Sequence, residues 1–120
     1  MKRENIPVKV IILNNESLGM IRHFQEMYFN SKFVQAIKEN GYSSPNFTKI
    51  AEAYGLKGIN VSKIEEVQSL KEELFNKEPI LINISLGDKT YVYPKLAVGK
   101  PIDDQEPLID RKLYEELKCL

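Results

Sequence analysis

The sequence predicts an α/β fold with a partial doubly wound, mainly parallel sheet, followed by an extended carboxyl-terminal tail. Apolar, β-branched runs at 6–13, 58–61 and 80–86 alternate with stretches of helical periodicity. The runs at 6–13 and 80–86 lack polar alternation, which is typical of strands buried on both faces of a parallel sheet. This alternation favours one domain with right-handed crossovers and about three or four parallel strands.

The first strand leads directly into a predicted helix over 17–29, where apolar residues recur at helical spacing on a broad face. Residues 30–43 are mixed in polarity, and we interpret them as a connection that contains a short helix over 32–38. The first strand and the first helix are therefore joined with almost no intervening loop.

Two further helices have predicted start signals. Ser44 is the expected cap of one, Pro45 fits its first turn and Gly55 ends it. Ser62 and Glu65 have the spacing of a capping box, in which each side chain bonds the other residue's backbone amide. The helix after this box is expected to bury four apolar residues: Ile64, Val67, Leu70 and Leu74.

The composition of the sequence changes after the last predicted apolar strand. We expect 1–86 to belong to the sheet domain and 87–120, which three prolines punctuate, to form an extended tail over the surface. The tail is predicted to end in a short helix with Asp110 as its cap. The residues expected to face inward from that helix are Leu113, Leu117 and Tyr114.

Composition excludes several classes of function. Seventeen basic and seventeen acidic residues give a formal net charge of zero, so no overall field favours nucleic acid or an anionic membrane. The single cysteine, Cys119, has no partner for an intramolecular disulfide, which suits a reducing compartment. With no apolar stretch near the length of a membrane helix and no signal-peptide core, the predicted location is the cytoplasm.

The run from Val8 to Met20 carries the candidate chemistry. Its apolar strand stops at Asn14 and Asn15, which leaves amide and carbonyl oxygens at the carboxyl end of a strand, where open α/β sheets bind ligands. Such hard oxygen donors suit Mg²⁺, which often shares its coordination shell with phosphates. Taken alone, however, an asparagine pair is also a common turn.

Three segments together carry a family resemblance: PVKVIILNNESLGM at 7–20, NFTKIAEAYGLKG at 46–58 and VYP at 92–94. They resemble the carboxyl-terminal part of acetolactate synthases, which are thiamine-diphosphate-dependent enzymes. The resemblance covers about the first 95 residues. It includes the second half of the family's signature, the paired asparagines, but not the Gly-Asp-Gly half. We therefore expect the chain to start inside the cofactor domain.

The resemblance implies specific site residues. Magnesium would be bound by the Asn15 side chain and the Ser17 backbone carbonyl, and the cofactor would be lined by Ser17, Leu18, Gly19 and Met20. No catalytic residue can be assigned, because the family's activating glutamate lies in another subunit's amino-terminal domain. Phe24 stands where the family usually has tryptophan, so the acceptor substrate can differ. His23, the single histidine, receives no role.

The implied function is that of a fragment. The intact enzyme would use thiamine diphosphate and Mg²⁺ to decarboxylate a 2-oxo acid and join the product to a second carbonyl compound. The fragment alone is expected to bind cofactor weakly or not at all and to be inactive. An unpaired edge of the first strand is expected to drive self-association into a homo-oligomer. The alternative is a non-catalytic α/β binding module that kept the fold and lost the cofactor site.

Overall fold

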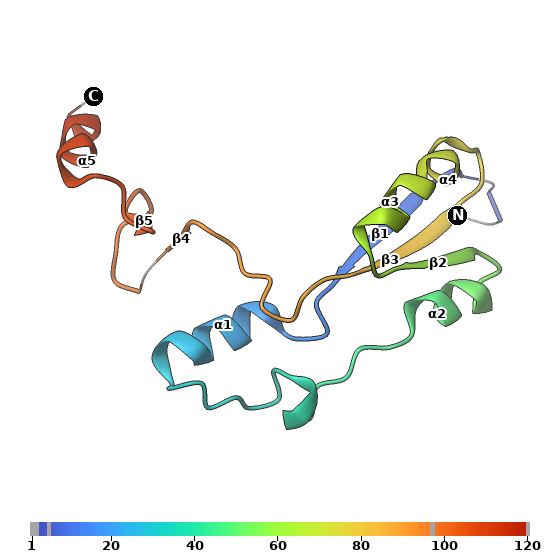
Figure 1. The fold of residues 1–120 in the computed structure, drawn as a ribbon, viewed down its shortest axis with the longest axis horizontal. Helices are drawn as coiled ribbons and strands as arrows, with labels where there is room; N and C mark the ends of the chain where they lie inside the picture. The colour runs from blue at the N-terminus through green and yellow to red at the C-terminus, as the bar shows by residue number, and fades with distance from the viewer. Residues whose placement is uncertain (1–2, 5, 97, 120) are drawn as a thin grey trace. The chain divides into compact units, whose positions relative to one another are not determined.

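The computed structural model describes residues 3–4, 6–96 and 98–119, and the chain divides into two compact units, Met1–Thr90 and Tyr91–Leu120 (Figure 1). The first unit contains β1 (Lys9–Asn14), α1 (Gly19–Tyr28), a 3₁₀ turn (Lys38–Asn40), α2 (Phe47–Ala53), β2 (Lys57–Val61), α3 (Ile64–Ser69), α4 (Lys71–Phe75) and β3 (Ile80–Ser85). The second unit contains β4 (Lys95–Leu96), β5 (Gln105–Glu106) and α5 (Arg111–Lys118).

The first unit is built on a parallel sheet with the strand order β1-β3-β2. The central strand β3 pairs with β1 on one side and with β2 on the other, so that Ile82 lies opposite both Ile11 and Ile59. The predicted α/β fold with a mainly parallel sheet is confirmed. β3, the last strand of this unit in sequence, lies in the middle, and the three strands run parallel because β1 and β2 are each followed by helical connections that return the chain to the amino end of the sheet.

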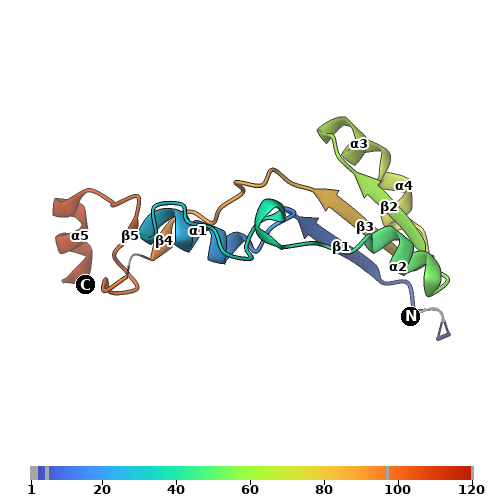
Figure 2. The same ribbon diagram turned by 90° about the horizontal axis from the view of Figure 1, so that it is seen from below.

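The helices pack against both faces of the sheet. Successive residues of a strand point to opposite faces, and Ile80 and Ile82 of β3 form a buried cluster with Val61 of β2 and Leu70, which joins α3 to α4. On the other face, α2 lies so close to β2 that an added Cβ at Gly58 would meet the Thr48 backbone at 2.8 Å. The sheet therefore separates α2 from α3 and α4 (Figure 2).

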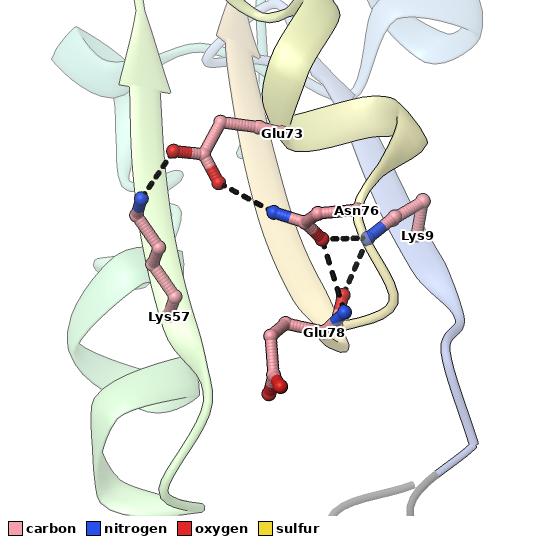
Figure 3. A network of polar contacts seen from close by, with 5 residues as sticks. All are labelled: Lys9, Lys57, Glu73, Asn76 and Glu78. Carbon is pink, nitrogen blue, oxygen red and sulfur yellow. Dashed lines mark hydrogen bonds and ion pairs between the residues drawn. The ribbon is translucent and has the colours of Figure 1, made fainter.

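A polar network ties the amino ends of the two outer strands together (Figure 3). Lys9 begins β1, and its ammonium group donates to Asn76 Oδ1 at 2.6 Å and to the Glu78 carbonyl. Lys57 begins β2 and pairs with Glu73, which also accepts from Asn76 Nδ2 at 3.0 Å. The Lys57 hydrogen bond lowers the pKa of the Glu73 carboxyl below its usual 4.5. The segment from α4 to β3 thus holds both outer strands at their first residue.

The connection after α1 differs from the prediction. No helix forms over 32–38, and the only helical turn found in the described part of 30–43 is the 3₁₀ turn Lys38–Asn40. The Gln25 side chain accepts from the Val34 amide at 3.1 Å and donates to its carbonyl at 3.3 Å, and the φ angle of Gln35 is +51°. These side-chain bonds and the left-handed backbone replace helical hydrogen bonds.

The cap of α2 is Asn46, so the prediction of Ser44 is wrong. Asn46 Oδ1 accepts from the Lys49 amide at 3.0 Å and from the Thr48 hydroxyl at 2.8 Å. Both residue types are good caps, and the helix begins two residues later than the Ser-Pro pair suggested. Gly55, with φ +69°, follows the helix as predicted.

The predicted capping box of the next helix is also wrong, by one residue. Glu66, not Glu65, turns back to the helix start, where its carboxylate accepts from the Ser62 amide at 2.7 Å and the Lys63 amide at 3.2 Å. These backbone bonds lower the pKa of Glu66 below its usual 4.5. The single helix expected here divides into α3 and α4 at Leu70, which is buried. The other three residues predicted to be buried are exposed: Ile64, Val67 and Leu74.

The second unit contains a short antiparallel pair, β4 with β5, in place of a wholly extended tail. Asp110 caps α5 as predicted, accepting from the Leu113 amide at 3.0 Å. Tyr114 is buried and its hydroxyl donates to Asp103 at 3.2 Å, whereas Leu113 and Leu117 are about half exposed, contrary to the prediction. Within the described residues, no helix is long and apolar enough to cross a membrane.

Candidate functional site

The candidate site is the turn that joins β1 to α1. Asn14 is buried, and its side chain accepts from the Glu16 amide at 3.0 Å and donates to the Glu16 carboxylate at 2.6 Å. Its carbonyl accepts from the Leu86 amide, just beyond β3, at 2.8 Å. Glu16 has φ +51°, a left-handed conformation that these local bonds hold in place. Asn14 therefore acts as the turn residue and anchors the loop to the sheet.

Asn15 and Ser17, the predicted metal ligands, are neighbours in this turn. Among the residues that the structure describes, Asn15 Oδ1 accepts only a long bond, 3.4 Å, from the Ser17 amide, and the buried Ser17 Oγ has no hydrogen-bond partner. A Cβ added at Gly19 would stand 2.5 Å from Asn15 Nδ2, so the amide occupies the space that the missing side chain leaves. A weakly bonded amide oxygen, main-chain oxygens and an orphaned hydroxyl form a donor set that fits Mg²⁺.

The apolar residues of the motif lie on an open surface. Leu18 donates its amide to the Ala36 carbonyl at 2.9 Å, which holds the loop against the connection after α1. The side chains of Leu18 and Met20 are 40% and 84% exposed. These two residues can line one side of a bound molecule, but as described they do not enclose one.

A cavity of about 220 Å³ lies beside the motif, at the carboxyl ends of the three strands. Its wall includes Asn14 and Glu16 from the turn and six mostly polar residues from other parts of the chain: Ser44, Pro45, Asn46, Phe47, Asn60 and Asn83. The five predicted site residues, 15 and 17–20, are not among the residues that line it. Asn14 and Glu16 of the turn therefore face the cavity, whereas the predicted ligands do not line it.

The cavity wall contains an amide chain that sequence reasoning missed. Asn83 Nδ2 donates to Asn60 Oδ1 at 3.0 Å, and Asn60 Nδ2 donates to Thr48 Oγ1 at 3.3 Å. The two asparagines are register partners on β3 and β2. A polar residue inside each of two apolar strands was the available signal, but their pairing depends on a register that the sequence alone does not give.

Metal-binding chemistry at this site rests on neutral oxygens. Across the described residues, no group of three or more His, Cys, Asp or Glu side chains is arranged to hold a metal ion. An ion bound by Asn15 and Ser17 would therefore need further ligands from outside this turn, such as phosphate oxygens.

Comparison with known proteins identifies the family. Residues 1–84 match the family model described as "Thiamine pyrophosphate enzyme, C-terminal TPP binding domain". The chain belongs to this family. The resemblance predicted from the asparagine pair and the two later segments is therefore confirmed. The family implies thiamine diphosphate, also called thiamine pyrophosphate, as the cofactor of its parent enzymes.

The similar curated proteins are acetolactate synthases. The mitochondrial catalytic subunit of Saccharomyces cerevisiae acetolactate synthase is 36% identical over 113 residues, covering 91% of this chain and 16% of its own length. The mitochondrial acetolactate synthase of Schizosaccharomyces pombe is 35% identical over 103 residues, covering 85% of this chain and 15% of its own length. The chain thus spans about one-sixth of the length of these relatives.

The fold is shared with solved structures, among them that of a thiamine diphosphate enzyme. The thiamine diphosphate-dependent 4-hydroxybenzoylformate decarboxylase of Rhodococcus jostii superposes with a TM-score of 0.59 at 29% identity. The match covers 73% of this chain and 16% of that protein. The architecture is therefore that of a thiamine diphosphate enzyme over most of the chain.

Proposed function

We propose that this chain is the later part of the cofactor-binding domain of an acetolactate synthase-like enzyme. The supporting observation is the position of the asparagine turn, which follows a parallel strand directly and precedes α1 in a domain of the thiamine pyrophosphate enzyme family. Residues 1–86 would form that part of the domain and 87–120 its tail. The whole enzyme would act on a 2-oxo acid, joining the product of its decarboxylation to a second carbonyl compound.

The residues of the turn would anchor the cofactor. The Asn15 amide oxygen and the Ser17 carbonyl would bind Mg²⁺, and the backbone at Gly19 would allow a close approach to the cofactor. Leu18 and Met20 would exclude water from one side of it. When bound, thiamine diphosphate supplies the electron sink that decarboxylation of a 2-oxo acid requires. This chain would contribute anchoring and orientation but no catalytic group, and so it would be inactive alone.

We also propose that the chain self-associates in the cytoplasm through the β1 edge. One side of β1 pairs with β3, and Ile11 and Leu13 remain 50% and 66% exposed. Open strand edges with apolar side chains favour pairing with another chain. Equilibrium sedimentation of the wild type and of Ile11→Lys tests this, because a charge on the edge strand should shift the population toward the monomer.

A second function, a binding module without catalysis, is favoured by the cavity. Its wall contains Asn14 and Glu16 but none of the residues predicted to bind the cofactor. A chain that has lost cofactor binding would still present this polar cavity at the carboxyl edge of its sheet, where α/β domains bind ligands. The two functions differ in whether Asn15 matters for binding.

Calorimetric titration with thiamine diphosphate and Mg²⁺ distinguishes them. We expect weak, saturable binding that requires Mg²⁺ and falls at least tenfold in Asn15→Ala, because the amide oxygen is one of the chain's two metal ligands. Asn40→Ala, at an exposed asparagine in the 3₁₀ turn, is the matched control and should bind as the wild type does. No binding to wild-type chain that circular dichroism shows to be folded would overturn cofactor binding by this chain alone and indicate an inert fragment of a longer parent enzyme, whereas binding that Asn15→Ala leaves unchanged would favour the module.

A further inference from the structure

Arg22 is a buried cation next to the cofactor motif. It lies in the first turn of α1, two residues after Met20, and only 6% of its surface is exposed. Burying a guanidinium without compensation is costly, so its partners must offset the loss of water. An arginine buried at this position is therefore held by specific contacts.

Those contacts reach across to the segment that follows β3. Arg22 Nη1 donates to the Asp88 carboxylate at 2.7 Å and to the Asp88 carbonyl at 3.0 Å, and the guanidinium lies 5.5 Å from the centre of the Phe33 ring. The Arg22 hydrogen bond lowers the pKa of the Asp88 carboxyl below its usual 3.8, so the pair is charged at neutral pH. The Asp88 side chain itself is 65% exposed, which leaves it open to substitution without creating a cavity.

The segment after β3 also forms a hydrogen bond at the start of the turn, where β1 ends. The Leu86 amide donates to the Asn14 carbonyl at 2.8 Å, at the last residue of β1. The chain from Leu86 to Asp88 therefore joins the residue before the turn to the first turn of the helix after it. Residues 15–21, which include every predicted ligand, lie between the Asn14–Leu86 hydrogen bond and the Arg22–Asp88 pair.

Within the span, the ligand residues make few bonds, and these include a bridge from Ser17 to Ile37 in the connection after α1. Ser17 donates to Asn15 Oδ1 at 3.4 Å, and Leu18 donates to the Ala36 carbonyl at 2.9 Å. Octahedral Mg²⁺ demands ligand oxygens placed within a fraction of an ångström, and a turn obtains such placement from fixed ends and supporting contacts. At the α1 side of the turn, the charge-assisted hydrogen bonds between Arg22 and Asp88 supply such a supporting contact.

We propose that Arg22 and Asp88 are the positioning pair of the cofactor turn. By fixing the start of α1 against the segment after β3, the pair sets where Asn15, Ser17 and Met20 stand relative to one another. This inference rests on the proposed function for its ligand, whereas the ordering of the turn is a property of the chain without any ligand. Neither residue touches the reacting atoms.

Hydrogen exchange of the ligand-free chain tests the ordering. In Asp88→Ala the amides of Ser17 to Met20 should exchange at least tenfold faster than in the wild type, while those of β3 keep their rates. Asp88→Asn, which keeps an acceptor but no charge, should fall between the two. Glu72→Ala, which removes an exposed carboxylate from α4, is the control and should leave the turn unchanged. Wild-type exchange at Ser17 to Met20 in Asp88→Ala would overturn the proposal.

Titration of the same variants with thiamine diphosphate and Mg²⁺ separates positioning from general stabilisation. Measured at a temperature where all variants are folded, the affinity should fall at least fivefold in Asp88→Ala and remain that of the wild type in Glu72→Ala. A lower unfolding midpoint with unchanged affinity would mean that the pair only stabilises the fold, and would contradict positioning. If the wild type binds no cofactor, cofactor binding by this chain alone fails and the pair has no cofactor to position, while the exchange data still decide whether it orders the turn.

Discussion

The two parallel strands β3 and β1 have similar sequences and very different surroundings. Four of the six residues of β3, Ile80 to Asn83, are buried, whereas in β1 only Asn14 is. Both strands are apolar and rich in isoleucine, and they run side by side in register from Lys9↔Ile80 to Asn14↔Ser85. The difference comes from position, because β3 has a strand on each side and β1 has one only on its β3 side.

This comparison separates what stabilises the domain from what serves the site. The central strand supplies the core, and the half-exposed edge strand delivers the asparagine turn. Ligand-binding segments are commonly the less protected parts of a fold. Substitutions on β3 should therefore change the free energy of unfolding, and substitutions at the end of β1 should change binding.

The largest expected difference is in the free energy of unfolding between variants of two isoleucines that are register partners on β1 and β3. Ile82 is fully buried and Ile11 is 50% exposed, although they are register partners. Ile82→Ala should lower the free energy of unfolding by about 2–5 kcal/mol through lost burial and a residual cavity. Ile11→Ala should lower it by about 1 kcal/mol or less. Urea denaturation followed by circular dichroism measures both, and equal losses would remove the distinction between the strands.

Two glycines provide a second, smaller contrast. Gly58→Ala places a Cβ 2.8 Å from the Thr48 backbone of α2, which cannot move without shifting the helix, and should destabilise the domain by about 1–3 kcal/mol. Gly19→Ala instead meets the end of the Asn15 side chain at 2.5 Å. Because that amide can rotate away, stability should change little while Mg²⁺-dependent cofactor binding is lost. Thermal unfolding paired with calorimetry checks this, and a Gly19→Ala chain that binds normally would contradict the role of Asn15.

The smallest expected effect is acid sensitivity, which arises outside β3 because β3 carries no titratable side chain. Hydrogen bonds from Lys57 and Arg22 lower the pKa values of Glu73 and Asp88. A carboxyl whose pKa is lower in the folded state than in the unfolded state stabilises the fold when the pH is above the unfolded-state pKa, which is 4.5 for Glu73 and 3.8 for Asp88. This stabilisation is lost as the pH falls through the folded-state pKa. Stability should be level near neutral pH and decline below about pH 4.5.

Urea midpoints measured from about pH 6 to about pH 3 test the acid effect. Glu73→Gln should make the decline shallower, because it removes one of the groups whose pKa changes on unfolding. Glu72→Gln, on the exposed surface of the same helix, serves as the control. An equally steep decline in both variants would assign the acid sensitivity to other groups.

Much of the fold was predictable because the positions of the strands and helices along the chain are indicated by local sequence patterns. The alternation of apolar runs with helical periodicity predicted the parallel sheet, and Asp110 was correctly predicted to cap α5. The errors arose where two local signals competed. Asn46 rather than Ser44 caps α2, and Glu66 rather than Glu65 caps α3, since neighbouring residues of equal capping ability differ only in tertiary context. The exposed Ile64 shows the same limit, because periodicity does not say whether a partner surface is present.

The position of the asparagine turn was predictable from the sequence, but its surroundings were not. The asparagine turn follows β1 where the sequence predicted it, and its family is confirmed. The Arg22–Asp88 pair joins residues 66 positions apart. No local sequence pattern predicts a contact between the start of α1 and the segment after β3. The Asn60–Asn83 bond depends on strand register for the same reason.

The strand order β1-β3-β2 also governs when the domain can fold during synthesis. Both outer strands pair with β3, which is made after them, so the sheet cannot begin to form until β3 starts to leave the ribosome at Ile80. Pairing between strands distant in sequence is intrinsically slow, and until it happens the apolar strand β1 waits without a partner. The nascent chain should therefore pass through an aggregation-prone interval between the synthesis of β1 and that of β3.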